Sequence, residues 1–142
     1  MKGIKGLIIG VLAVSTLSCG DDSQNEAQVG KWLAEPDGVE RSGCDLESND
    51  GLVNCQVTNN SSCVVLDLGI NDLYSLTIAL DGNANRVEAG SYTLEKNKII
   101  LCPGGGSDCY TVPVVDSDFS SMTIEIDTPE DGCELRIDMT KI

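Results

Sequence analysis

Apolar and polar residues alternate one by one along much of this chain, and that period of two limits the possible folds more than any other feature. The alternation is clearest in residues 74–80, 110–114, 122–127 and 135–140. Successive side chains of an extended strand point to opposite faces, so each segment predicts a β-strand with one buried and one solvated face. Shorter segments also have strand character: residues 31–34, 53–58, 63–68, 87–94 and 98–102. No segment after residue 19 has a sustained helical period, which indicates an all-β fold.

The segments between these predicted strands are short and rich in the residues that form turns. They are residues 81–83, 95–97, 103–106, 116–118 and 129–132. Parallel neighbours would need crossover connections of about a dozen residues or more, so short connections favour antiparallel pairing. We therefore expect an up-and-down meander of eight to nine strands that forms a small closed or nearly closed barrel.

The chain has seven cysteines and no histidine. Cys19 ends the apolar N-terminal segment, and the other six are Cys44, Cys55, Cys63, Cys102, Cys109 and Cys133. An even number in an exported chain predicts structural disulfides, and without histidine we expect no metal site. Cys102 ends one predicted strand and Cys109 begins the next, so these two should face each other across a hairpin. The remaining four cysteines permit three pairings, which stay open.

The N-terminus predicts export. A short cationic start, residues 1–5, precedes a run of twelve mostly apolar residues, 6–17. A membrane-spanning helix needs about 20 apolar residues, so this run is too short and residues 1–18 are predicted to be a signal peptide. Ser18 followed by Cys19 resembles the cleavage site of bacterial lipoproteins. That resemblance implies that the Cys19 thiol carries the lipid anchor.

Gly20 stands where many lipoproteins of the inner membrane have Asp, so the same resemblance implies the outer membrane, with the leaflet left open. Residues 19–28 are polar and predict a flexible tether. Residues 29–142 are long enough for one domain with a single core.

The chain is strongly acidic. Its net charge is −14, and removal of a signal peptide that contains Lys2 and Lys5 but no acid would make it −16. This charge argues against nucleic acid as a partner and against binding of anionic lipid through a cationic face.

Two short motifs indicate a family resemblance. Gly30-Lys31-Trp32 begins the first predicted strand, and Gly-Ser-Tyr-Thr-Leu at residues 90–94 precedes Lys98-Ile99 in a predicted hairpin. With the meander, they make residues 29–142 resemble the lipocalin-like (calycin-like) domains of small bacterial lipoproteins. The resemblance implies that Trp32 closes the base of a barrel, beside Gly30, and that Arg136 from the last strand packs on its indole.

Nothing in the chain predicts catalysis. A serine or cysteine nucleophile would have no histidine as its base, and the acidic residues are too numerous for any pair to stand out. We therefore expect no enzyme activity and no cofactor.

The remaining hypotheses are a module that binds a small apolar or amphipathic ligand, and a structural lipoprotein whose filled barrel contacts another envelope protein. The best candidates for a ligand-binding wall are Tyr74, Leu76, Ile78, Tyr92, Tyr110 and Met122.

Overall fold

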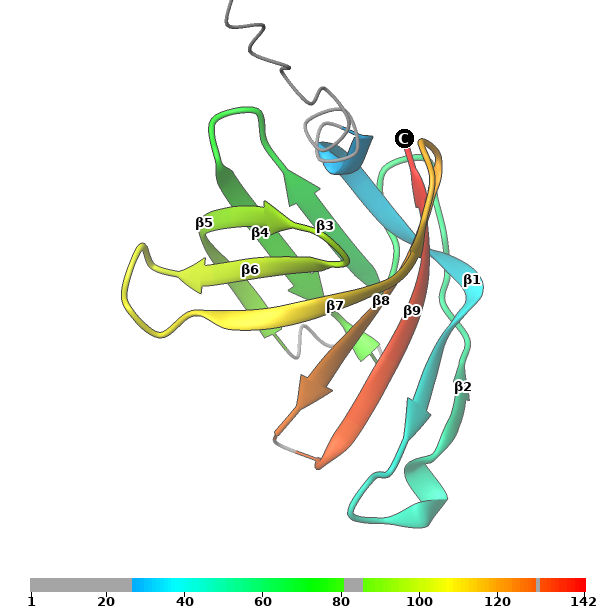
Figure 1. Ribbon diagram of the computed structural model, residues 1–142. Coiled ribbons are helices and arrows are strands. Elements are labelled where there is room, and N and C mark those ends of the chain that lie inside the picture. The colour runs from blue at the N-terminus through cyan, green and yellow to red at the C-terminus, as the bar shows by residue number, and fades with distance from the viewer. Residues whose placement is uncertain (1–26, 81–85, 130) are drawn as a thin grey trace, which may run out of the picture.

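The computed structural model describes residues 27–80, 86–129 and 131–142, which form one antiparallel sheet of nine strands (Figure 1). The strands are β1 (Gly30–Ser42), β2 (Gly51–Val53), β3 (Val64–Leu68), β4 (Leu73–Ile78), β5 (Arg86–Glu95), β6 (Lys98–Pro103), β7 (Tyr110–Ser117), β8 (Ser121–Thr128) and β9 (Cys133–Lys141). A 3-10 helix, η1 (Glu47–Asn49), precedes β2.

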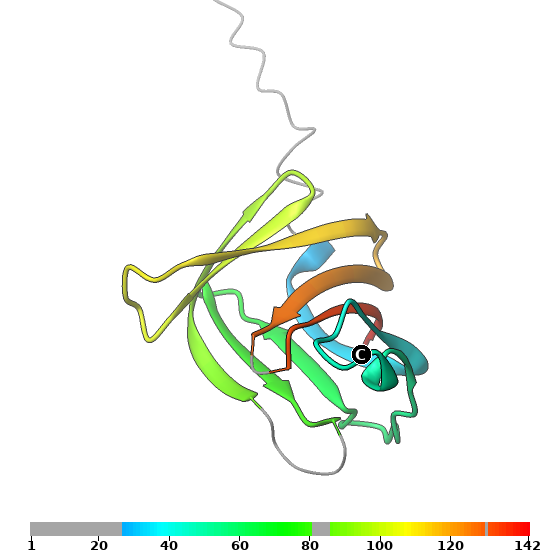
Figure 2. The ribbon, with the colours of Figure 1, turned by 90° about the horizontal axis from the view of Figure 1, so that it is seen from below.

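The sheet closes on itself. The first half of β1 pairs with β3, and β1 also pairs with β9 over nearly its whole length, so β1 and β3 to β9 form a closed barrel of eight strands. The short β2 pairs with the second half of β1. Figure 2 shows the curved strands surrounding one interior. The predicted antiparallel meander and its closure are confirmed.

Alternate residues of each strand fill the interior. In β9 the odd-numbered residues from Cys133 to Met139 are buried and the even-numbered ones are exposed. The largest completely buried side chains include Trp32, Leu66, Ile99 and Ile124. An eight-strand barrel is just wide enough to be filled in this way or to hold one small ligand.

The two ends of the barrel differ in their connections. The base, where β1 begins and β9 ends, has short turns at residues 69–72, 96–97 and 118–120. The opposite end, which we call the mouth, has longer connections, such as residues 54–63 and 104–109. In Figure 1 the base is at the top, near the C-terminus, and β2 lies toward the mouth.

The first strand is longer than predicted. Residues 31–34 are only its beginning, because the strand passes through an irregularity at residues 35–38 and resumes pairing with β9 at Val39. Proline and glycine normally interrupt a strand, but a bulge tolerates them. Gly38 is required there, since a Cβ atom would lie 2.6 Å from the carbonyl oxygen of Asp138.

The predicted strand at residues 53–58 is wrong. The strand in this region is β2, which ends at Val53, and the chain then crosses the mouth. The backbone N–H of Cys55 donates to the carbonyl of Pro36, at 2.9 Å, so local pairing with the bulge of β1 replaces a regular ladder.

Three disulfides hold the mouth. Cys44–Cys133 links the β1–β2 connection to the start of β9, and Cys55–Cys63 closes the connection between β2 and β3. Cys102–Cys109 joins β6 to β7, one position beyond the register pair Leu101 and Tyr110. The predicted disulfide across this hairpin is confirmed. Its Cα atoms are 4.1 Å apart. Several disulfides in one small domain indicate an oxidising, exported location.

The predicted signal peptide, Cys19, most of the tether and the turn at residues 81–83 lie outside the described residues. Gln28, which we had assigned to the tether, is buried and belongs to the folded domain. Within the described part of the chain, no helix has the length and apolar character needed to cross a membrane.

Candidate functional site: a polar cluster inside the barrel

The base is closed around Trp32, whose side chain is completely buried. The indole Nε1 donates to the carbonyl oxygen of Gln28 at 2.8 Å. The ammonium of Lys141, the register partner of Trp32, lies 5.5 Å from the ring centroid and donates to the carbonyl of Ala27 at 3.0 Å. Gly30 lies beside the Lys141 side chain, where a Cβ atom would be 2.5 Å from Cε. The N-terminal segment is thus fixed over the base.

Arg136 does not pack on Trp32, and this prediction is wrong. Arg136 is exposed on the outer face of β9, opposite Glu40 and Glu125 in register. Side chains alternate along the strand, so Arg136 must point outward because Leu135 and Ile137 point inward. Lys141 lies on the inward-facing set at the base end of β9, and it supplies the cation that we had assigned to Arg136.

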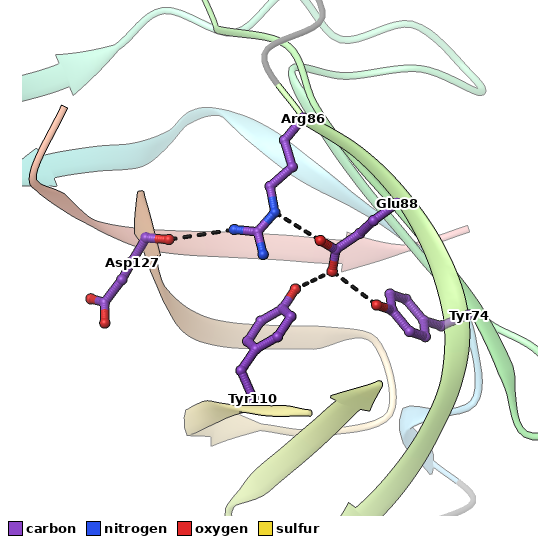
Figure 3. Close-up of polar contacts among 5 residues, drawn as sticks. All are labelled: Tyr74, Arg86, Glu88, Tyr110 and Asp127. Carbon is purple, nitrogen blue, oxygen red and sulfur yellow. Dashed lines mark hydrogen bonds and ion pairs between the residues drawn. The ribbon is translucent and has the colours of Figure 1, made fainter. Parts of the chain in front are cut away.

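A polar cluster lies inside the barrel, on strands β4, β5 and β7, away from β1 and β9 (Figure 3). It consists of Tyr74 from β4, Arg86 and Glu88 from β5, and Tyr110 from β7. One oxygen of the Glu88 carboxylate accepts hydrogen bonds from both tyrosine hydroxyls, that of Tyr74 at 2.9 Å. The other oxygen accepts from Nε of Arg86, also at 2.9 Å. Glu88 is therefore the centre to which the other three side chains converge.

Arg86 connects this cluster to the mouth. Its Nη1 donates to the carbonyl oxygen of Asp127, near the end of β8, at 3.4 Å, and its guanidinium lies 5.0 Å from the centroid of the Tyr110 ring. The side chains of Arg86 and Glu88 are 23% and 14% exposed, so solvent still reaches the ion pair.

Burial and the Glu88 carboxylate keep both tyrosines protonated. Burial is the larger cause that raises the pKa of Tyr74, and the hydrogen bond to Glu88 raises it further. The same two causes, in the same order, raise the pKa of Tyr110. At neutral pH both hydroxyls therefore donate to Glu88, and Arg86 balances the charge of the carboxylate.

Arg86 and Glu88 were missing from the sequence-based site, although a signal for Glu88 was present. Tyr92 was predicted to face the interior, and Glu88 lies four residues earlier in the same strand, on the same face. Inward-facing strand positions are usually apolar, so an acidic residue at such a position indicates a candidate functional site. Nothing in the sequence alone predicted which side chains would meet it.

Four of the six predicted wall residues lie at or beside the cluster. Tyr74 and Tyr110 meet at Glu88, and Leu76 and Ile78 are the register partners of Glu88 and Arg86. Met122 is buried in the aliphatic core. Tyr92 lies toward the base, where its hydroxyl donates to the carbonyl of Gly69 at 2.5 Å.

Among the described residues, two of the clefts have volumes above about 300 Å³, a size at which small-molecule sites are common. A cleft of about 490 Å³ lies at the base between residues 95–97 and residues 114–119. A cavity of about 400 Å³ lies at the mouth, where Leu80 and Val53 contribute to its wall. The segment Ala79-Leu80 directly follows Ile78, the register partner of Arg86, so this second cavity is at the same end as the cluster, although no residue of the cluster lines it.

No group of three or more potential metal ligands occurs among the residues that the structure describes. The cluster contains one carboxylate and one guanidinium that neutralise each other. Its chemistry is hydrogen bonding to a polar group in an apolar surrounding.

An up-and-down barrel of eight antiparallel strands is the architecture of lipocalins, so the chain has a lipocalin-like fold. Among solved structures, it is similar to a lipocalin-like protein from Bacteroides uniformis ATCC 8492, with 15% sequence identity and a TM-score of 0.48. That similarity covers 82% of this chain and 99% of the other. No protein-family model matches the sequence, and no curated protein matches it.

Proposed function

We propose that this protein is an exported, lipid-anchored binding protein whose barrel holds a small amphipathic ligand from the mouth. The observation that carries the binding role is the cluster of Arg86, Glu88, Tyr74 and Tyr110. It brings an ion pair and two hydroxyls into an interior whose other large side chains are mostly aliphatic.

Stability alone does not account for an ion pair in this place. Replacing a buried ion pair by apolar side chains of similar volume is often neutral or stabilises by about 1–4 kcal/mol, and the Arg86–Glu88 pair is mostly, though not completely, buried. A barrel that only had to be filled would therefore do as well with aliphatic residues at positions 86 and 88. A few polar groups within an apolar wall are the usual composition of a small-molecule site.

The surroundings of the cluster define the chemistry of the ligand. Leu76 and Ile78 are directly opposite Glu88 and Arg86 in register, so the apolar body of a ligand would meet aliphatic side chains beside the polar group. The net charge of −14 disfavours the approach of anions, which leaves an uncharged or cationic head group. The width of an eight-strand barrel restricts the ligand to one small molecule.

The anchoring part of the proposal rests on residues 1–19. One acyl chain gives only marginal attachment to a membrane, and the two or three chains of a bacterial lipoprotein would hold this protein stably. A Cys19→Ala variant should accumulate as an uncleaved precursor that takes up no labelled fatty acid. Processing and acylation of that variant would contradict the assignment.

Titration with Nile red, an uncharged fluorescent probe, tests the binding part. The disulfide-bonded protein should bind about one molecule, and 1-decanol should displace it. Glu88→Gln should weaken the binding of decanol about tenfold, because a hydrogen bond to a charged group is lost. Glu134→Gln, on the exposed face of β9, is the matched control and should change nothing. Equal affinities for the two variants, or no saturable binding by the unchanged protein, would contradict the proposed site.

A further inference from the structure

The base carries exposed apolar side chains at the tips of its turns. Ile70, in the β3–β4 turn, is 94% exposed, and Phe119, in the β7–β8 turn, is 77% exposed. Leu73 and Ile142 are also exposed at this end. We call these four residues the apolar rim. Leu52 and Val87 toward the mouth are exposed as well, so exposed apolar residues alone do not single out the base as a contact surface. The ordered turns, the position of the tether and the charge distinguish the apolar rim from them.

Both turns are ordered by their own hydrogen bonds. In the β3–β4 turn the N–H of Gly69 donates to the carbonyl of Leu73 at 2.9 Å. In the β7–β8 turn the Asp118 carboxylate accepts from the N–H groups of Ser120 and Ser121, each at 2.8 Å. Ile70 and Phe119 are thus held outward by closed turns.

The rim surrounds the point where the tether joins the domain. Val29 lines the same cleft as Ile70, and Ala27 and Gln28 line the same cleft as Phe119. The backbone N–H of Ile142 donates to the carbonyl of Lys31 at 3.0 Å, next to the same segment. Only residues 20–26 separate Cys19 from Ala27. Seven residues span at most about 25 Å when fully extended, so an acylated Cys19 would hold the base close to the bilayer.

The distribution of charge also favours the base as the end of the domain that faces a lipid surface. The segments at the base, residues 27–32, 66–75, 94–98, 115–123 and 139–142, contain four lysines and five carboxylates. Glu35 and Asp138, which accept hydrogen bonds from Thr140 and Thr123 of these segments, bring the carboxylates at this end to seven. The rest of the described chain has eleven carboxylates and three arginines. An anionic lipid surface therefore repels the base less than the rest of the domain. The base is only weakly acidic and carries the apolar rim, so it is not a cationic docking face.

We propose that the base of the barrel rests on the lipid bilayer, with Ile70 and Phe119 inserted at the level of the head groups and the mouth directed away. This inference rests on the proposed anchoring at Cys19. It adds a second, non-covalent contact with the membrane, and it orients the barrel so that the candidate ligand site stays accessible.

The test uses the acylated mature protein in vesicles of phosphatidylcholine and phosphatidylglycerol that contain brominated lipid, which quenches tryptophan fluorescence at short range. Phe119→Trp reports on the base, and Leu52→Trp, at a 71% exposed position of β2, is the matched reporter near the mouth. The buried Trp32 contributes the same background to both. Interfacial insertion reaches about 5–10 Å into the boundary between head groups and acyl chains. We therefore expect roughly twofold more quenching of the added fluorescence for Phe119→Trp than for Leu52→Trp.

The outcomes separate the two proposals. Flotation of the protein with the vesicles, with equal quenching of both reporters, would keep the lipid anchor and overturn the docking of the base. Failure to float would overturn stable anchoring through the lipid on Cys19 and, with it, the docking. Ile70→Trp is a second reporter in case the first substitution disturbs its turn, and it should be quenched like Phe119→Trp.

Discussion

The base and the mouth of this barrel are stabilised in different ways. The base has short turns and is closed by Trp32, with the N-terminal segment and Lys141 packed on the indole. The mouth has long connections, and all three disulfides of the described chain lie there. Long connections bury few side chains, so covalent links replace packing at that end. The packed base gives a rigid scaffold, and the disulfides hold the long connections of the mouth in place on it. Loops on a rigid scaffold commonly carry function, so this arrangement is compatible with ligand binding at the mouth.

The largest effect should come from the disulfide Cys44–Cys133. Its cysteines are 89 residues apart, and opening so long a loop costs about 4 to 5 kcal/mol in the chain-entropy model. The cysteines of Cys102–Cys109 are only 7 apart, for which the same model gives about 2.5 kcal/mol. Urea denaturation of the two double serine variants measures both. Equal losses would show that loop length does not decide how the mouth is stabilised.

Trp32→Ala should destabilise the protein by about 3 to 5 kcal/mol, because it removes a completely buried side chain and leaves a cavity. The change is at the base, so Nile red affinity at the mouth should be nearly unchanged under conditions where the variant stays folded. Thermal unfolding and a titration at low temperature check the two statements. A large loss of affinity in the folded variant would mean that the two ends are not independent.

The polar cluster should make stability fall in alkali. The folded-state pKa values of Tyr74 and Tyr110 lie above the ordinary value of 10.0. Their contribution is therefore fully present below pH 10 and is lost as the pH rises toward the folded-state values. Urea denaturation between pH 8 and pH 11 should show this loss, and the double variant Tyr74→Phe with Tyr110→Phe should flatten it. An unchanged slope in the double variant would contradict the cluster.

The smallest effect distinguishes the two cations of β9. A cation on a tryptophan face contributes about 0.5 to 2 kcal/mol, so Lys141→Met should destabilise by about that amount. The control Arg136→Met, on the outer face, should stay within about 0.5 kcal/mol. In double-mutant cycles with Trp32→Ala, Lys141 should couple and Arg136 should not. Coupling to Arg136 would restore the assignment that the structure rejects.

The sequence predicted the barrel well because period two, short connections and cysteine placement are all local signals. Leu135, Ile137 and Met139 identify the inner face of β9 without any structure. The full length of β1 was missed because Pro36 and Gly38 normally end a strand. In the structure β1 pairs with β9 on both sides of these residues, so pairing between distant segments outweighs the local preference for a strand end.

The site was harder to predict for the same physical reason. Alternation along β9 already places Arg136 on the outer face, but only the register between β1 and β9 shows that Lys141 is the cation that lies opposite Trp32. The convergence of Tyr74 and Tyr110 on Glu88 depends on side chains from three strands, two of which are not adjacent in the sheet. Strand alternation predicted that Tyr74 and Tyr110 face the interior, and only the structure shows that both meet Glu88.

The central claim is that the cluster around Glu88 receives the ligand, and the three tyrosines of the chain test it directly. In protein labelled with ¹³C at the tyrosine rings, NMR spectra are recorded during titration with 1-decanol. If the ligand binds at the cluster, the signals of Tyr74 and Tyr110 should shift together and saturate, while that of Tyr92, hydrogen-bonded to Gly69 at the base, stays in place. Saturable shifts of Tyr92 alone, or equal shifts of all three, would contradict binding at the cluster.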